Sequence, residues 1–142
     1  MRTDHTGFER QWGTTMHAVH GKTNPEVPTD GVRRLASVIR LVPELEQMYR
    51  ELHANVWDSV ASRLRKSNIR NYSIFIAGIE GRKYLFSYCE YSGSDYEGDM
   101  RKIAEDPETR RWWQQTDPCQ IPLPECVEGK RWCDLERVFF LP

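Results

Sequence analysis

The sequence lacks long apolar runs and blocks of like charge. No apolar run reaches the ~20 residues that a membrane-spanning helix needs, and residues 1–7 lack the apolar stretch of a secretory signal. The 20 Lys and Arg residues nearly balance the 21 Asp and Glu residues, so a nucleic-acid or anionic-membrane partner is not indicated. We therefore expect a cytoplasmic protein that binds neither membrane nor nucleic acid.

Motifs of several common chemistries are also missing. There is no Gly-rich phosphate loop, no Gly-x-Ser-x-Gly elbow and no His-Glu-x-x-His stretch. Cys119, Cys126 and Cys133 are spaced by seven residues, which matches no known zinc site. In the cytoplasm these cysteines would be reduced thiols, and their role is left open. We expect no metal and no cofactor.

The 142 residues correspond to one domain with an N-terminal extension. Residues 1–31 show no sustained apolar period and end in Pro25, Pro28 and Gly31, so we predict a flexible N-terminal arm. A docking role for this arm is the alternative. The folded domain is predicted to span residues 32–142.

The pattern of apolar residues predicts an α+β fold. It indicates strands at 35–42, 72–76, 84–91 and 135–141, one long helix at 44–66 and a second helix at 95–104. A turn at 80–82 joins the middle strands as a hairpin, a helical turn starts at Pro107, and a loop spans 118–132. The order βαββαβ is the ferredoxin-like split unit. Its uncovered sheet face should pair with a second copy or hold a ligand.

Two aromatic groups stand out within the predicted domain. Tyr49, His53 and Trp57 are four residues apart and would share one face of the long helix. Trp112 and Trp113 are adjacent, so one can pack while the other lines a cleft and stacks on a sugar ring. From spacing alone, a packed or surface histidine and two tryptophans in the core explain these residues as well.

Four segments resemble the L-rhamnose mutarotase family. They are Tyr-x-x-x-His-x-x-x-Trp at 49–57, Asn-Tyr-Ser-Ile-Phe at 71–75, Arg-Arg-Trp-Trp at 110–113 and Val-Phe-Phe-Leu-Pro at 138–142. They occur in the family's order and span residues 34–142. The resemblance implies a homodimer of ferredoxin-like protomers, of the dimeric α/β barrel type, with a monosaccharide substrate and no cofactor.

The resemblance also assigns roles to residues. His53 matches the family's proton donor, and the substrate-binding positions correspond to Tyr49, Tyr72, Trp112 and Trp113. The chain departs from the family in its N-terminal arm and in strand 36–40, which lacks the lysine or methionine often found there. Residues 113–120 look like a branch whose sugar need not be L-rhamnose, and L-fucose, another 6-deoxyhexose, is the obvious competitor.

The implied reaction is mutarotation, the interconversion of α and β anomers by opening and closing the ring of a 6-deoxyhexose. An imidazole with a pKa near ~6.5 can give or take the required protons at neutral pH. The second proton-transfer group is open, with water or a tyrosine as candidates. The alternatives are a non-catalytic ligand-binding or dimerisation module on the same fold, and a small oxygenase of the related dimeric barrels.

Overall fold

The computed structural model describes residues 17–142. The elements follow the order β1 (Arg33–Leu41), η1 (Pro43–Leu45), α2 (Glu46–Ala54), α3 (Asp58–Lys66), β2 (Ile69–Ile79), β3 (Arg82–Tyr91), α4 (Tyr96–Glu105), α5 (Pro107–Thr116), η2 (Asp117–Cys119), β4 (Gln120–Ile121) and β5 (Cys133–Leu135). All strand pairs are antiparallel. The strand order is β2-β3-β1-β4, with β5 also pairing with β1. The predicted α+β class is confirmed.

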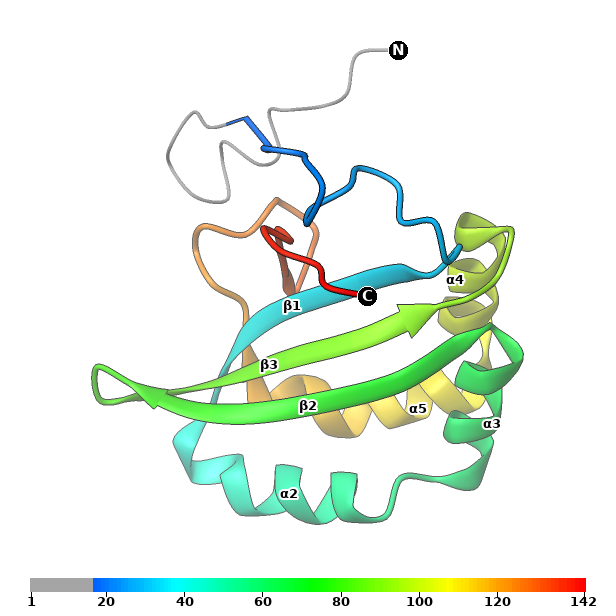
Figure 1. Cartoon of the computed structure of the whole chain (residues 1–142). Coiled ribbons are helices and arrows are strands. Elements are labelled where there is room, and N and C mark those ends of the chain that lie inside the picture. The colour runs from blue at the N-terminus through cyan, green and yellow to red at the C-terminus, as the bar shows by residue number, and fades with distance from the viewer. Residues whose placement is uncertain (1–16) are drawn as a thin grey trace.

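The sheet curls, and its helices lie on one side (Figure 1). Inward-facing residues alternate along the long strands, because successive side chains of a strand point to opposite faces. Ile39, Leu41 and Leu85 pack with Tyr49 of α2 and with Cys119 in one buried cluster. Ile69 and Tyr91 pack with Ile103 of α4 in a second cluster, together with the half-buried Leu35, Leu64 and Cys89.

The prediction of one continuous helix at 44–66 is wrong, because two helices, α2 and α3, occupy this range. α2 ends at Ala54, and Asn55 adopts φ −138° and ψ 68°, which is not helical. α3 begins at Asp58 with Trp57 as its N-cap. The apolar spacing fits both arrangements, because Tyr49 of α2 and Leu64 of α3 pack against strand residues in the two-helix form as well. Asn has a low helix propensity, which favours a break at this position.

The predicted hairpin is confirmed, with strands longer than expected. β2 and β3 pair continuously from Ile79↔Arg82 to Ser73↔Tyr88. Glu80 and Gly81 form the turn with φ of 51° and 77°, as two-residue hairpins require. Near the other end the register shifts between Arg70 and Ser73, so two residues of β2 oppose one residue of β3 in a β-bulge.

The second helical region is also longer than expected. Asp95 caps α4 by accepting a hydrogen bond from the Gly98 amide at 3.1 Å, which agrees with the predicted start of this helix. Asp106 caps α5 by accepting from the amide of Thr109 at 2.9 Å and from its hydroxyl at 2.7 Å. The helical turn predicted at Pro107 is therefore a full helix that carries both tryptophans. The predicted loop 118–132 contains η2 and the short strand β4.

The predicted C-terminal strand 135–141 is wrong beyond its first residue. β5 covers Cys133–Leu135, and the residues after it leave the sheet and cross its open face (Figure 1). The Phe140 amide donates to the Thr23 carbonyl at 2.7 Å instead of to a strand. The Arg34 guanidinium lies 3.9 Å from the centre of the Phe140 ring. An apolar run can thus cover a sheet face as well as extend the sheet.

Residues 17–31 contact this C-terminal segment. Arg137 donates to the Asn24 side chain at 2.8 Å and also to the Pro25 carbonyl, and Asn24 donates to the Val19 carbonyl at 2.7 Å. Residues 1–16 lie outside the described residues. The flexible arm at 1–31 therefore stays a prediction.

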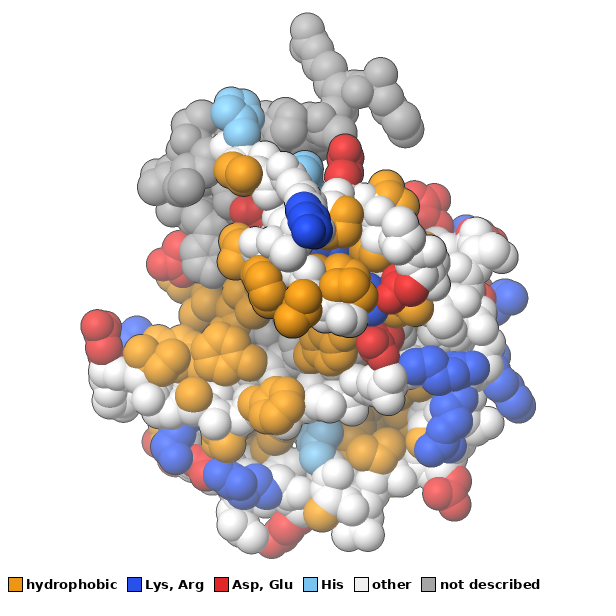
Figure 2. Space-filling model, in the orientation of Figure 1, with side chains coloured by type: hydrophobic (Ala, Val, Ile, Leu, Met, Phe, Trp, Pro, Cys, Tyr) orange, Lys and Arg blue, Asp and Glu red, His pale blue; other side chains and the backbone are white. Residues whose placement is uncertain are grey.

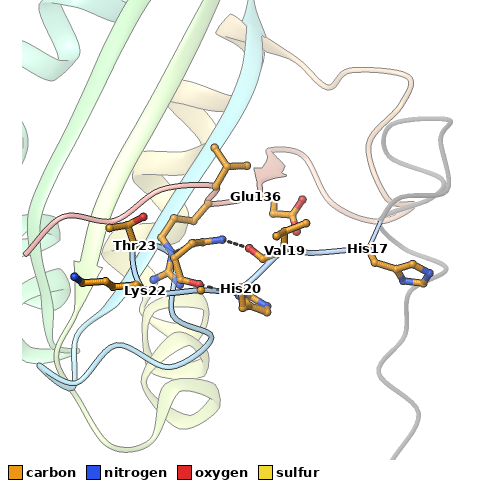
Figure 3. Close-up of a pocket in the computed structure, with 10 residues that line it drawn as sticks. His17, Val19, His20, Lys22, Thr23 and Glu136 are labelled. Atoms are coloured by element: carbon orange, nitrogen blue, oxygen red, sulfur yellow. Dashed lines mark hydrogen bonds between the residues drawn. The ribbon is translucent and has the colours of Figure 1, made fainter.

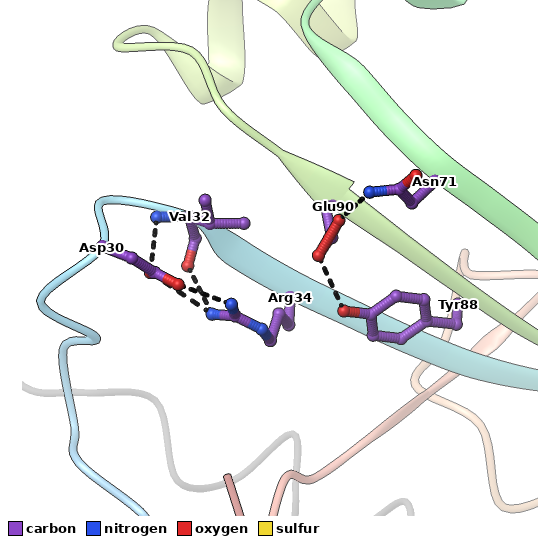
Figure 4. A network of polar contacts seen from close by, with 6 residues as sticks. All are labelled: Asp30, Val32, Arg34, Asn71, Tyr88 and Glu90. Atoms are coloured by element: carbon purple, nitrogen blue, oxygen red, sulfur yellow. Dashed lines mark hydrogen bonds and ion pairs between the residues drawn. The ribbon is translucent and has the colours of Figure 1, made fainter. Parts of the chain in front are cut away.

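Two groups of polar contacts lie at one end of the open face, one at the start of β1 and one between β2 and β3 (Figure 4). Asp30 accepts from Arg34 at 2.6 Å and from the Val32 amide at 3.0 Å, and these bonds lower the pKa of the Asp30 carboxyl. Glu90 accepts from the Tyr88 hydroxyl at 3.1 Å and from the side chain of Asn71.

Over residues 17–142, no helix has the length and apolar character needed to cross a bilayer.

Candidate functional site

The candidate site is built around His53 in the last turn of α2. Its imidazole stacks on the ring of Tyr49, with centroids 4.0 Å apart and an angle of 26° between the planes. It meets Trp112 of α5 edge to face at 5.3 Å. The sequence placed Tyr49 and His53 on one helical face, and this is confirmed. The contact between His53 and Trp112, which are far apart in the sequence, arises from the packing of α2 against α5.

The hydrogen bonding of His53 defines which nitrogen is available. Nδ1 lies 2.9 Å from the Tyr49 carbonyl oxygen. A carbonyl oxygen only accepts, so Nδ1 carries the proton and Nε2 presents its lone pair when the ring is neutral. Burial lowers the pKa of His53 from its ordinary value of 6.5, partly opposed by the bond to Tyr49. At neutral pH the imidazole is therefore a neutral base, and Nε2 makes no hydrogen bond within residues 17–142.

Trp57 joins the same aromatic group from a different element. It is the N-cap residue of α3 rather than part of the α2 stripe. Its ring nevertheless packs edge to face against Trp112 at 5.2 Å, with 75° between the planes. The break between α2 and α3 thus places Trp57 against α5 without disturbing the cluster that the sequence indicated.

The two adjacent tryptophans of α5 have different environments. Trp112 is buried, with 6% of its surface exposed, whereas Trp113 is 38% exposed. Successive residues of a helix point about 100° apart, which explains the difference. Trp112 packs against the His53 ring, whereas the Trp113 ring is partly exposed to solvent.

The hydroxyl of Tyr49 is buried without a hydrogen-bond partner. The residue is only 4% exposed, and its oxygen makes no hydrogen bond in the described part of the chain. The Gln120 side chain comes near enough to oppose the rise in pKa but does not reach hydrogen-bond geometry, and burial dominates and raises the pKa of the phenol. The hydroxyl is therefore a neutral donor with no acceptor.

Tyr72 lies in the bulge of β2. Nearly half of the residue is exposed (48%), yet desolvation by the surrounding protein raises the pKa of its hydroxyl to about 12. Its hydroxyl interacts electrostatically with the Cys89 thiol and with Tyr49. Because Cys89 and Tyr49 belong to the inward side of the sheet, the Tyr72 hydroxyl is on the side of the helices. The structure thus brings Tyr49, Tyr72, His53 and Trp112 to one side of the sheet.

Three polar residues in this region were not identified from the sequence. Ser37 of β1 and Ser87 of β3 oppose one another and their hydroxyl oxygens are 2.5 Å apart. Gln120 of β4 is 8% exposed and lies near the Tyr49 hydroxyl. The only sequence signal for the serine pair was Ser37 among the apolar residues of the alternating pattern Leu35-x-Ser37-x-Ile39. This serine indicates a polar pair only once the strand register places it opposite Ser87.

Three cavities of the structure lie away from this region. One of about 330 Å³ lies between residues 17–24 and the C-terminal segment, with His17, His20 and Lys22 among its lining residues (Figure 3). Another of about 470 Å³ lies between the open sheet face and the C-terminal segment. Among residues 17–142, no cluster of three His, Cys, Asp or Glu side chains is arranged to hold a metal ion.

Comparisons with known proteins agree on one family. The model of the L-rhamnose mutarotase family matches residues 34–141. The L-rhamnose mutarotase of Bacillus subtilis is 30% identical over 110 residues, covering 78% of this chain and 99% of that protein. The L-rhamnose mutarotase of Opitutus terrae is 32% identical over 108 residues, covering 76% and 97%. In fold, the chain resembles the crystal structure of an L-rhamnose mutarotase from Formosa agariphila, with a TM-score of 0.59 at 24% identity, covering 78% and 99%.

Proposed function

The chain belongs to the L-rhamnose mutarotase family and is therefore a carbohydrate-acting isomerase, and we propose that it interconverts the α and β anomers of a 6-deoxyhexose. L-rhamnose is the substrate that the relatives' names support, and L-fucose is the competing candidate. The observation that carries the proposal is the neutral His53 imidazole in an aromatic cluster, with an Nε2 that makes no hydrogen bond within residues 17–142.

Ring opening requires a proton to leave the C1 hydroxyl and another to reach the ring oxygen. In this mechanism His53 Nε2 takes the proton of the C1 hydroxyl as a base, while the ring oxygen takes a proton from the second group, a water molecule or a tyrosine hydroxyl. When the ring recloses, the imidazolium returns its proton to the C1 oxygen as an acid, and the second group takes back the proton of the attacking hydroxyl. The lowered pKa of His53 supports this role, because the resting ring is unprotonated at neutral pH. General acid–base catalysis contributes typically ~10²–10⁴-fold, which is ample for a reaction that is already facile in water.

The tyrosines act as hydrogen-bond donors. Burial raises the pKa of Tyr49 and that of Tyr72, the latter to about 12, so both phenols stay protonated at neutral pH and neither is the base. Each can donate to a hydroxyl or to the ring oxygen of the sugar. The unpartnered Tyr49 hydroxyl gains the most from such a contact, because its burial cost is already present in the free protein.

The tryptophans provide apolar surface for the sugar. Trp113 is partly exposed and can stack on the C–H face of the ring or on the C6 methyl group. Trp112 packs against His53 and keeps the imidazole oriented. A 6-deoxysugar, with its apolar C6, suits a site that combines indole rings with a few hydroxyl groups.

Anomeric exchange measured by NMR saturation transfer tests the proposal. Exchange of L-rhamnose and of L-fucose is compared for the wild type, His53→Ala and the matched control His20→Ala, whose imidazole lies in the distant cavity of Figure 3. We expect the wild type and His20→Ala to accelerate exchange, and His53→Ala to lose ~10²-fold or more. Full activity in His53→Ala would refute the assignment of the base.

We also propose that the protomer is ferredoxin-like and that two protomers form a homodimer. The strand order β2-β3-β1-β4 supports a ferredoxin-like protomer. Apolar side chains gather over the sheet and the C-terminal segment on the open face (Figure 2), including Phe75, Phe139 and Leu141, which are 63%, 61% and 70% exposed. A patch of this kind supports a homodimer of the dimeric barrel type. A cytoplasmic location stays a prediction from the sequence.

A further inference from the structure

The apolar core on the inward side of the sheet is interrupted by a pair of serines. Ser37 and Ser87 oppose one another on the two central strands. Along β3, Ser87 stands between Leu85, which packs with Tyr49, and Cys89, which packs in the second cluster. Along β1, Ser37 likewise stands between Ile39 and Leu35. The serines therefore occupy the junction of the two buried clusters.

This junction is on the same side of the sheet as the candidate site. Residues two apart in a strand share a face, so both serines are on the side of Ile39 and Leu85, whose cluster contains Tyr49. His53 stacks on Tyr49. Both serines are only half-buried, in the middle of two strands, so helix packing does not seal this part of the sheet. The small side chains leave room where a leucine or phenylalanine would fill the layer.

The serine pair also has unused hydrogen-bonding capacity. Each hydroxyl has one proton and two lone pairs, and the 2.5 Å contact uses one proton and one lone pair. Within residues 17–142, neither hydroxyl has a second partner. One O–H donor and three lone pairs are therefore available to a ligand, in a region that is otherwise lined by apolar side chains.

We propose that Ser37 and Ser87 form a subsite that binds a ring hydroxyl of the sugar, on the sheet side of the substrate. This inference rests on the proposed mutarotase function and adds a specificity determinant to it. A hydroxyl can both donate to and accept from the pair, whereas a methyl group or a ring position without oxygen would leave the remaining O–H donor and lone pairs of the serines unused. The serine pair thus selects sugars that carry a hydroxyl at the position facing the sheet.

The test combines binding and exchange measurements on the full chain. Sugar binding is followed by tryptophan fluorescence and exchange by NMR saturation transfer, for Ser37→Ala, Ser87→Ala and the double variant. Ser73→Ala is the matched control, because Ser73 pairs with Tyr88, which lines the cavity of the opposite face. The sugars are L-rhamnose, L-fucose and L-rhamnose analogues that lack one ring hydroxyl each. Thermal unfolding verifies that each variant is folded.

We expect the double variant to bind the substrate roughly 2- to 12-fold more weakly, the range for one neutral hydrogen bond, with a raised KM and little change in kcat. For the analogue that lacks the contacted hydroxyl, wild type and double variant should bind equally. If the wild type binds the sugars and the double variant matches it for every sugar, the serine subsite is refuted while the function stands. If the wild type neither binds nor exchanges any of these sugars, both proposals fail. Binding that depends on the serines without exchange would support the subsite and refute the mutarotase function.

Discussion

The unpartnered hydroxyl of Tyr49 predicts a variant that gains stability as it loses function. Tyr49 as a whole is only 4% exposed. Tyr49→Phe removes its hydroxyl, which makes no hydrogen bond in the described part of the chain. A buried polar group without a partner costs about 1–3 kcal/mol. Because Gln120 lies near this hydroxyl, we take the lower end and expect a gain of about 1 kcal/mol in the free energy of unfolding.

The expected change in melting temperature follows from the size of the domain. An unfolding entropy of ~2.1 cal/mol/K per residue gives ~0.2–0.3 kcal/mol/K for a domain of about 110 residues. A gain of about 1 kcal/mol therefore raises Tm by about 4 °C. Thermal unfolding by circular dichroism measures this shift, and the exchange assay should show weaker sugar binding by the same variant.

A matched substitution should have the opposite effect. Tyr91 is also buried, but its hydroxyl donates to Asp99 at 2.5 Å and accepts from the Asp95 amide at 3.1 Å. Tyr91→Phe leaves both partners short of a bond, so we expect a loss of ~2 kcal/mol and a Tm lower by ~8 °C. A decrease in Tm for Tyr49→Phe similar to that for Tyr91→Phe would refute the claim that the Tyr49 hydroxyl is unpaired.

Three further predictions concern pH, capping and assembly. Because burial lowers the pKa of His53 from 6.5 and the neutral ring is the base, kcat/KM should fall only below this lowered pKa and stay constant at and above pH 6.5. On acidification the imidazole of residue 53 takes up its proton at a higher pH in the unfolded chain than in the folded chain, so the free energy of unfolding should fall below pH 6.5. His53→Gln should remove this part of the pH dependence of stability. An activity that rises on acidification would contradict this assignment. Asp106→Ala removes both bonds to Thr109 and should cost about 0.5–2 kcal/mol in urea unfolding; an unchanged midpoint would rule out the cap. Phe75→Asp should yield monomers in analytical ultracentrifugation with little change in secondary structure, since Phe75 is 63% exposed; an unaltered dimer would place the interface elsewhere.

Several local features were correct from the sequence because neighbouring residues decide them. The hairpin turn depends on Glu80 and Gly81, whose positive φ values are set by the two-residue loop. The start of α4 depends on Asp95, whose carboxylate reaches an amide three residues away. Tyr49 and His53 share a face because the helix repeats every 3.6 residues. The family resemblance was also confirmed, since it depends on short motifs in a fixed order.

Other features depend on contacts between distant parts of the chain. The apolar spacing of residues 45–64 permits one helix or two, and the packing of Trp57 against Trp112 accompanies the break. The apolar residues near the C-terminus fit a strand, but Phe140 bonds to Thr23 and packs under Arg34 instead. In both cases the hydrophobic pattern is compatible with two arrangements, and only tertiary contacts select one.

The sequence by itself determined the fold class, the family and the pairing of Tyr49 with His53, because periodicity and short motifs encode them locally. Only the tertiary structure decided the surroundings of the site. The Ser37 and Ser87 hydroxyls meet across 50 residues through strand register. The Tyr49 hydroxyl makes no hydrogen bond in the described part of the chain, although Gln120 of β4 lies near it. Both depend on the positions of side chains from distant segments, which no local pattern in the sequence specifies.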